Sequence, residues 1–268
     1  MKIAILGCGW LGFELGKELR ALNHEVKASV TRNEKFGDLH AAGLVPYTIK
    51  LYEKGIQGDI RSFLSKSDCI VVNIPPGLRK NPEADFVSKV RTIVPYLEKS
   101  YCPRIIFVSS TSVYKNEPDF PEVNENTETD NSSNIAVQLR NAELLLLNNE
   151  NFKTEILRFG GLIGDDRHPV NQLSGKKDLS SPKAPVNLVH RRDCIKAIIA
   201  LIEKPATNGI FNLVHPDHPT REDYYTKIAQ DRELEAPHFS NEKSSEGKIV
   251  SSDRFQNELN FKFEHSIY

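Results

Sequence analysis

The sequence has almost no net charge and few cysteines. Its 35 Lys and Arg residues are offset by 36 Asp and Glu residues, which leaves a formal net charge of −1. Such a balance gives no indication of binding to nucleic acid or to an anionic membrane surface. The four cysteines show neither CxxC nor the Cys/His spacing of a metal site: Cys8, Cys69, Cys102 and Cys194. We therefore expect reduced thiols and no bound metal.

Long apolar runs are also missing. No stretch approaches the ~20 residues that a membrane-spanning helix needs, and the apolar start at Met1 lacks the pattern of a cleavable signal. No internal repeat is visible. The 268 residues are enough for one extended α/β domain or one domain with a small appendage. These features predict a cytoplasmic protein whose partners are small molecules.

The most informative motif lies at the start of the chain. An apolar strand, Lys2 to Leu6, leads directly into GxGxxG, formed by Gly7, Gly9 and Gly12, and an amphipathic helix pattern follows. Gly7 permits a tight turn, Gly9 lets the backbone approach a pyrophosphate, and Gly12 lets helix and strand pack closely. A glycine-rich packing turn is the alternative interpretation, but the order strand, glycines, helix favours dinucleotide binding.

Strand and helix patterns alternate along the rest of the chain. Apolar strands separated by helices such as Phe86 to Lys99 predict a parallel sheet covered on both faces, a doubly wound Rossmann-type α/β fold. We predict a nucleotide-binding domain at 1–160 and a smaller substrate-side lobe at 161–268, interleaved with the last strands. The expected strands after the first are Glu25–Val30, Leu44–Ile49, Cys69–Asn73, Arg104–Ser109, Lys153–Arg158 and Ile210–Leu213.

Ligands of doubly wound sheets bind beyond the carboxyl ends of the strands. We therefore expect Asn73 to Gly77, Ser109 to Tyr114 and Phe159 to Gly164 to face one crevice with the glycine loop. The polar stretches Glu117 to Ser133 and Asp165 to Pro185 are expected to form its rims. The expected coenzyme-binding residues are Gly7, Cys8, Gly9, Trp10, Leu11, Gly12, Thr31, Arg32, Asn73, Ile74, Pro75, Ser109, Phe159, Gly160 and Gly161.

The end of the second strand indicates which coenzyme binds. An NAD-selective site usually carries Asp or Glu there, whereas this chain has Thr31 and Arg32. A guanidinium pairs with the 2′-phosphate of NADP in a bidentate fork, and no carboxylate repels that phosphate. The alternative is that Arg32 is an exposed loop arginine. The sequence favours NADP(H) over NAD(H).

Four further segments resemble the extended short-chain dehydrogenase/reductase superfamily, in its epimerase and dehydratase branch. They are SSTSVY (Ser109 to Tyr114), RFGGLIG (Arg158 to Gly164), VNLVHRRDCIKAI (Val186 to Ile198) and GIFNLVHPDHPT (Gly209 to Thr220). The opening GCGWLG and the short C-terminal part are most similar to an atypical subgroup of NAD(P)-dependent epimerases. The resemblance spans nearly the whole chain.

The resemblance also implies a proton relay, and this chain departs from it. In the superfamily a Ser or Thr positions the substrate oxygen, and a Tyr whose pKa is lowered by a nearby Lys transfers the proton. Ser110 matches the hydroxyl. Ala142 and Glu143 set the register of the helix that carries YxxxK, and by that register Ile135 and Leu139 replace the Tyr and the Lys. Neither side chain can move a proton.

If hydride transfer occurs, another group must donate the proton. The candidates are Tyr114, His190, His168 and Asp165, and the expected catalytic residues are Ser110 and Tyr114. The expected substrate contacts are Ser110, Thr111, His168 and His190. Each has a structural alternative: Tyr114 as a packed aromatic, His190 as a loop tie, and Asp165 with His168 as parts of a solvated turn.

Three functions remain open. The first is an NADP-dependent reductase or epimerase acting on a sugar or nucleotide sugar, with a relocated acid. The second is an inactive NADP(H)-binding sensor, which Ile135 and Leu139 support. The third is an unrelated Rossmann hydroxyacid or imine dehydrogenase. It is disfavoured because such enzymes follow the nucleotide domain with a long all-helical domain, whereas strands in this chain continue to about Phe211. The apolar run Leu144 to Leu147 fits either a homodimer interface or core packing.

Overall fold

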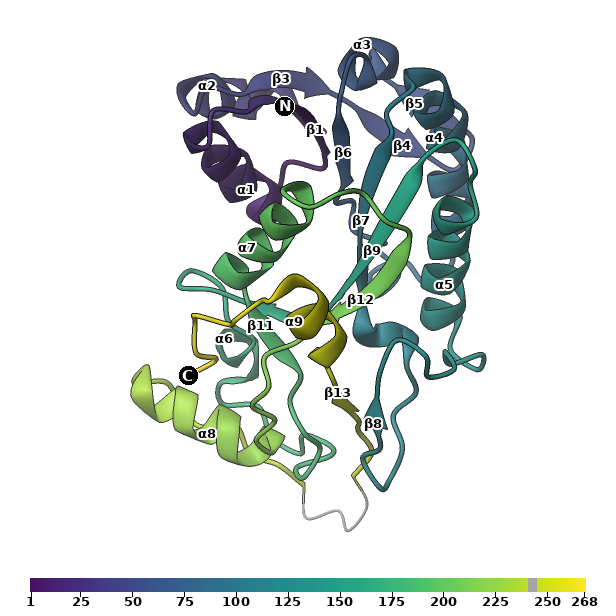
Figure 1. The fold of residues 1–268 in the computed structure, drawn as a ribbon. Helices are drawn as coiled ribbons and strands as arrows, with labels where there is room; N and C mark the ends of the chain where they lie inside the picture. The colour runs from purple at the N-terminus through teal and green to yellow at the C-terminus, as the bar shows by residue number, and fades with distance from the viewer. Residues whose placement is uncertain (241–244) are drawn as a thin grey trace. The chain divides into compact units, whose positions relative to one another are not determined.

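The computed structural model describes residues 1–240 and 245–268 and divides into two compact units (Figure 1). The first unit comprises residues 1–113, 130–158 and 195–210, and the second comprises 114–129, 159–194 and 211–268. The chain passes from the first unit to the second at 158/159. It also crosses between the units at 113/114, 129/130, 194/195 and 210/211, a finer interleaving than the pattern of the sequence suggests.

A seven-stranded sheet forms the centre of the fold, in the order β12-β9-β7-β6-β1-β2-β3. The pairs β1–β2, β2–β3, β1–β6 and β6–β7 are all parallel. This order confirms the predicted doubly wound Rossmann-type fold. The strands are β1 (Lys2–Leu6), β2 (Glu25–Val30), β3 (Val45–Thr48), β6 (Cys69–Val72), β7 (Arg104–Ser110), β9 (Lys153–Phe159) and β12 (Gly209–Leu213).

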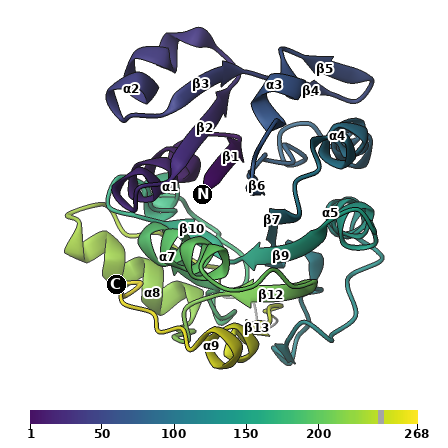
Figure 2. The same cartoon turned by 45° about the horizontal axis from the view of Figure 1, so that its top comes forward.

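Helices cover both faces of the first unit's sheet. In Figure 2, α1 (Trp10–Ala21) and α2 (Phe36–Ala41) lie on one face, and α4 (Phe86–Ser100) and α5 (Asn134–Leu147) lie side by side on the other. The short α3 (Ile60–Leu64) packs against α4. Helices change face where the strand order reverses, between β1 and β6, because right-handed crossovers leave the two strands in opposite directions across the sheet.

The buried strands explain why the sheet forms. All four residues of β6 are buried, as are four of the five residues of β1. Such strands have no face to turn to water, so they require helices on both sides. The first unit also contains β4 (Lys50–Tyr52), which pairs antiparallel with β5 (Gly55–Gln57), and the 3₁₀ turns Asn33–Lys35 and Thr111–Val113.

The second unit is built from short elements. β10 (Gly161–Ile163) pairs in parallel with β11 (Leu188–His190), and β8 (Glu122–Val123) pairs in parallel with β13 (Ile249–Val250). Its helices are α6 (Val170–Leu173), α8 (Arg221–Asp231) and α9 (Asp253–Leu259), while α7 (Arg191–Ile202) begins in the second unit and ends in the first. α6 and α8 pack around an apolar cluster that includes Ile163, Val170, Tyr224 and Ile267.

All four cysteines are free and buried. In the described ranges 1–240 and 245–268, the helices are too short or too polar to span a lipid bilayer.

Candidate functional site

The loop between β1 and α1 has the geometry that the glycine motif predicts. Gly7 has a φ of +102°, and a Cβ there would lie 2.2 Å from the carbonyl oxygen of Asn73. A Cβ on Gly12 would lie 2.6 Å from the carbonyl oxygen of Gly7. Both glycines are therefore required by close backbone contacts, one by a left-handed conformation and one by helix–strand packing.

Gly9 differs from its two neighbours because a Cβ there would meet nothing within 4 Å. It is the N-cap of α1, whose N-terminus has no side-chain cap and no acidic residue in its first turn. The helix dipole favours a negative group at this uncapped end. The open space at Gly9 and the uncapped helix together fit a diphosphate.

Residues from two other strands hold this loop in place. The hydroxyl of Ser29, in β2, accepts a hydrogen bond from the N–H of Gly7 at 2.9 Å. The side-chain amide of Asn73, after β6, donates to the carbonyl of Gly7 at 3.0 Å. Ser29 was not predicted, because one serine in the mixed strand EVKASV does not by itself indicate burial. The hydrogen bonds of Gly7 with Ser29 and Asn73 therefore fix the conformation of the loop.

Other predicted coenzyme residues differ in exposure. The side chains of Cys8 and Leu11 are buried, and burial raises the pKa of the Cys8 thiol to about 12, so Cys8 offers its backbone and not its sulfur. Trp10 and Ile74 are half-buried, and Pro75 is exposed. Only main-chain atoms of Cys8 and Leu11 are suited to a coenzyme contact.

The segment after β2 carries two exposed cations. Thr31 and Arg32 are exposed, and Lys35 follows in the next turn. Lys35 is near enough to the glycine loop that its charge partly offsets the raised pKa of Cys8. The turn itself is tied to β3 by a hydrogen bond between Thr48 and Asn33. The segment after β2 thus presents two cations, with the carboxylate of Glu34 between them in sequence.

At the carboxyl end of β7, Ser109 and Ser110 have different partners. The buried hydroxyl of Ser109 donates to Glu143 of α5 at 2.5 Å, and Glu143 is paired with Arg158 of β9. The hydroxyl of the half-buried Ser110 lies 3.0 Å from that of Ser112 and accepts the Ser112 N–H. Ser109 is therefore committed to the interior, whereas Ser110 sits at the strand end with only a local partner.

α5 is the helix for which the resemblance predicts YxxxK. Leu139 is 2% exposed, and Ile135 is half-buried. Both are apolar side chains on the inner side of the helix. Thr111, predicted to contact substrate, is buried in the turn after β7.

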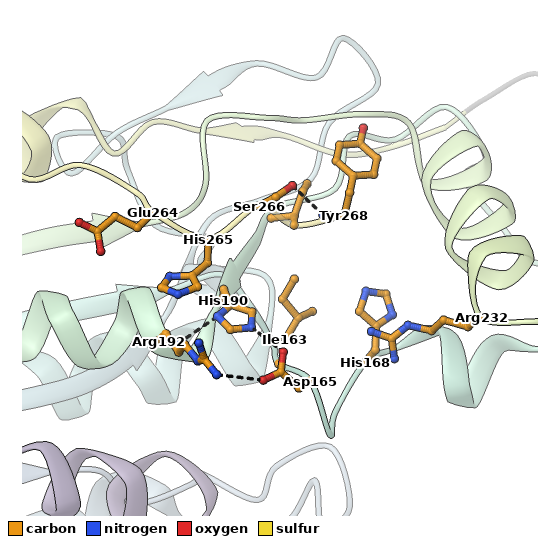
Figure 3. Close-up of a pocket in the computed structure, with 12 residues that line it drawn as sticks. Ile163, Asp165, His168, His190, Arg192, Arg232, Glu264, His265, Ser266 and Tyr268 are labelled. Carbon is orange, nitrogen blue, oxygen red and sulfur yellow. Dashed lines mark hydrogen bonds and ion pairs between the residues drawn. The ribbon is translucent and has the colours of Figure 1, made fainter.

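The second unit contains a cavity of about 300 Å³ (Figure 3). It brings together three of the four predicted proton-donor candidates, Asp165, His168 and His190. Ile163 and Gly164 also line it, together with two arginines and the C-terminal segment, which were not predicted: Arg192, Arg232 and Glu264 to Tyr268.

His168 is locked by hydrogen bonds at both ring nitrogens. Its Nδ1 accepts the N–H of Val170 at 3.1 Å, so Nε2 carries the proton and faces the Tyr224 hydroxyl at 2.9 Å. Tyr224 in turn donates to the carbonyl of Ile267 at 2.6 Å. Burial, followed by the charge of Arg232, lowers the pKa of His168 to about 4. His168 is thus a neutral anchor for the C-terminal segment.

His190 is stacked on His265, with ring centroids 4.9 Å apart and planes at 16°. Its Nδ1 accepts the Arg192 N–H, and its Nε2 lies 3.7 Å from the Asp165 carboxylate. Burial and the neighbouring His265 lower the pKa of His190. His190 is therefore held neutral at the end of β11.

Asp193 fixes the other ring of the stack. This fully buried carboxylate accepts the Nδ1–H of His265 at 3.0 Å and the backbone N–H groups of Glu264 and His265. Asp193 lies 72 residues from His265 in sequence, so no local pattern predicts the pair. The contact closes the C-terminal segment over the cavity.

The remaining candidates also lie in the second unit. Tyr114 is 2% exposed, and its hydroxyl donates to the side chain of Asn212 at 2.9 Å. That placement supports the packed-aromatic interpretation, and the role of Tyr114 as an acid stays a prediction. Phe159 is buried, and Gly160 and Gly161 lie against the backbone of Asn187, where a Cβ on Gly160 would be 2.7 Å from the carbonyl oxygen.

Among residues 1–240 and 245–268, no three His, Cys, Asp or Glu side chains converge as ligands would. Within the His190–His265 stack, the ring of His190 faces the carboxylate of Asp165 and the ring of His265 contacts that of Asp193.

A parallel sheet with a glycine loop at its strand-order reversal defines a dinucleotide-binding Rossmann protein. The sequence matches the NAD(P)H-binding family over residues 7–205, and the chain belongs to that family. It is also 33% identical to protein YeeZ of Escherichia coli (strain K12) over 267 residues, which covers 98% of this chain and 96% of the relative.

Solved structures share the fold. The UDP-N-acetylglucosamine 4-epimerase of Bacillus cereus superposes with a TM-score of 0.80 at 16% identity, covering 99% of this chain and 92% of that one. A short-chain dehydrogenase/reductase superfamily protein of Agrobacterium tumefaciens with bound NAD gives 0.79 at 18% identity, with coverage of 99% and 93%. The predicted resemblance to this superfamily is confirmed at the level of the fold.

Proposed function

We propose that the protein is an NADP(H)-dependent reductase or epimerase that acts on a sugar or nucleotide-sugar-like substrate, with a proton donor other than the superfamily's tyrosine. The observation that carries the proposal is the open, uncapped start of α1 at Gly9, beside loop glycines that tolerate no side chain. By its name, one of the two superposed proteins is an epimerase of UDP-N-acetylglucosamine, a nucleotide sugar. The other is a short-chain dehydrogenase/reductase superfamily protein with bound NAD. We place it in the cytoplasm, in line with its four free cysteines.

The residues fit the coenzyme's charge at two points. The N–H groups at the start of α1 would hold the diphosphate, and Arg32, with Lys35 behind it, would meet the 2′-phosphate. When bound, the nicotinamide supplies or accepts a hydride. The absence of Asp or Glu at Thr31 and Arg32, directly after β2, supports NADP(H) over NAD(H), because an NAD-selective site usually has its carboxylate there.

The chain's own contribution to chemistry at the first unit is Ser110. Its hydroxyl is held only by Ser112, and it stands next to Ser109, whose own hydroxyl is fixed on Glu143. A hydroxyl so placed can accept or donate a hydrogen bond to a substrate oxygen. Ile135 and Leu139 cannot transfer a proton, so the proton donor must be a residue in a different part of the molecule.

An inactive NADP(H)-binding sensor is the second candidate. The observation that favours it is the burial of Leu139, which is 2% exposed and fills with hydrocarbon the position where the superfamily has its lysine. A binding protein needs the glycine loop and Arg32 but no proton donor. Turnover of NADPH with any sugar or nucleotide sugar would exclude this alternative.

Calorimetric titration with NADPH and with NADH tests the proposal. We expect tighter binding of NADPH, and Arg32→Asp should narrow or reverse the preference because it replaces attraction of the 2′-phosphate by repulsion. Arg61→Asp, at an exposed position of α3, is the matched control and should leave the preference unchanged. Equal affinities for the two coenzymes before and after the Arg32 change would remove the NADP(H) assignment.

A further inference from the structure

The cavity of the second unit has a positive end. Arg232, which follows α8, lines it and points its guanidinium toward His168 (Figure 3). The guanidinium makes no hydrogen bond or ion pair with the residues that the structure describes. After burial, the charge of Arg232 is the second cause that lowers the pKa of His168. A guanidinium beside a cavity with no protein partner is suited to a phosphate or carboxylate.

His168 itself does not compete for that anion. Its two ring nitrogens are taken by Val170 and Tyr224, and the Tyr224 hydroxyl is taken by Ile267. The only other arginine of the lining, Arg192, faces Asp165 at 3.4 Å. Among the lining residues that the structure describes, Arg232 is therefore the cation that remains for a ligand.

The other end of the cavity offers a hydrogen-bond acceptor. Asp193 accepts the Nδ1–H of His265, which leaves the lone pair of His265 on Nε2. No partner of that Nε2 is found in the described ranges, and the ring is fixed from the side by its stack on His190. Figure 3 shows this pair and Arg232 on opposite sides of Ile163. The cavity thus has one end for an anion and one end for a hydroxyl.

We propose that this cavity binds a small polyhydroxy anion, a sugar phosphate or a uronic acid, with its anionic group on Arg232 and a hydroxyl donating to Nε2 of His265. Asp193 acts as the positioning residue that sets the tautomer of His265. The identity of the ligand as a sugar rests on the proposed function, whereas the pairing of an anion with a hydroxyl rests on the geometry alone.

The test is calorimetric titration of the full chain, without coenzyme, with glucose 6-phosphate, glucose, inorganic phosphate and glucuronate. We expect glucose 6-phosphate or glucuronate to bind more tightly than glucose or phosphate alone. The better of the two identifies the anion. Equal, weak binding of all four would overturn the proposal.

Two variants assign the ends of the site. Arg232→Gln should weaken the sugar acid and, if phosphate is the preferred anion, phosphate as well, by about tenfold, the loss expected for one charge-assisted hydrogen bond. His265→Asn should weaken the sugar acid but leave phosphate unchanged. Arg91→Gln, an exposed arginine of α4, controls for net charge. Affinities of both cavity variants equal to that of the unaltered protein would contradict the assignment.

The same samples separate this proposal from the proposed function. A protein that binds NADPH but none of the sugar acids overturns the cavity assignment and keeps the coenzyme. A protein that binds the sugar acid through Arg232 but not NADPH keeps the cavity assignment and overturns the proposed function. Chemical-shift changes at the His265 ring on addition of the sugar acid give a second readout that does not depend on heat.

Discussion

Glu143 of α5 and Arg158 of β9 form an ion pair in the interior of the first unit, with Arg158 Nη2 2.6 Å from the carboxylate. A second hydrogen bond joins Nε of Arg158 to the same carboxylate at 3.0 Å, and the hydroxyl of Ser109 donates to it as well. Glu143 thereby joins α5, β7 and β9 at one point. The residue next to Ser109 is Ser110, so this network fixes the backbone that presents the candidate hydroxyl.

The Glu143→Gln variant should therefore be strongly destabilised. It leaves the guanidinium of Arg158 buried without its countercharge, which costs about 3 kcal/mol of unfolding free energy or more. Urea denaturation measures this loss. Glu258→Gln breaks the exposed pair with Arg254 on α9 and should cost less than about 1 kcal/mol. Similar losses in the two variants would show that the interior pair is not the tie that its geometry indicates.

Restoring the superfamily's pair in Ile135→Tyr with Leu139→Lys should not create robust turnover. Leu139 is 2% exposed, so the new ammonium would be placed among apolar side chains and would lower stability by several kcal/mol. Ile135→Tyr alone, at a half-buried position, should be milder. NADPH oxidation with a nucleotide-sugar panel, together with urea unfolding, is the measurement. High activity in a fully stable double variant would contradict the expectation.

His168 should make stability depend on pH. Its pKa is about 4 in the folded chain against 6.5 for the free side chain, so protonation favours the unfolded state. The contribution is complete above pH 6.5 and is lost as the pH falls from 6.5 to 4, by at most about 3 kcal/mol. We expect the unfolding midpoint of the unaltered protein to fall over that interval.

Variants isolate this histidine from others whose pKa values are also lowered. His168→Asn should be less stable at pH 7, because the bonds to Val170 and Tyr224 are lost, but it should change less between pH 6.5 and 4. His40→Asn, at an exposed site on α2, should retain the full pH dependence. An identical pH dependence in both variants would remove the role given to His168.

The parts of the fold that depend on local patterns could be predicted. β1 and β2 begin and end at the expected residues, and the glycine loop lies between β1 and α1 as its spacing indicates. The short strands β8 and β10 were missed because two or three residues form a strand only when a partner from a distant segment lies beside them.

Only the glycine loop of the candidate site could be predicted from the sequence. Gly7 and Gly12 follow from a motif whose backbone requirements are general, but Ser29, Asp193 and His265 act through contacts between segments far apart in sequence. A sequence scan can mark Asp165, His168 and His190 as polar residues after strands. It cannot show that His168 has no free ring nitrogen, because its partners come from α6 and α8.

The central claim is that the start of α1 holds the diphosphate of NADP(H), and calorimetry of NADPH with the unaltered protein and with Gly9→Val tests it most directly. A Cβ at Gly9 meets open space, so we predict that the free energy of unfolding of Gly9→Val lies within about 1 kcal/mol of that of the unaltered protein. NADPH binding by the variant should be lost. Undiminished NADPH affinity in a folded Gly9→Val variant, or no binding of any nicotinamide coenzyme by the unaltered protein, would contradict the account.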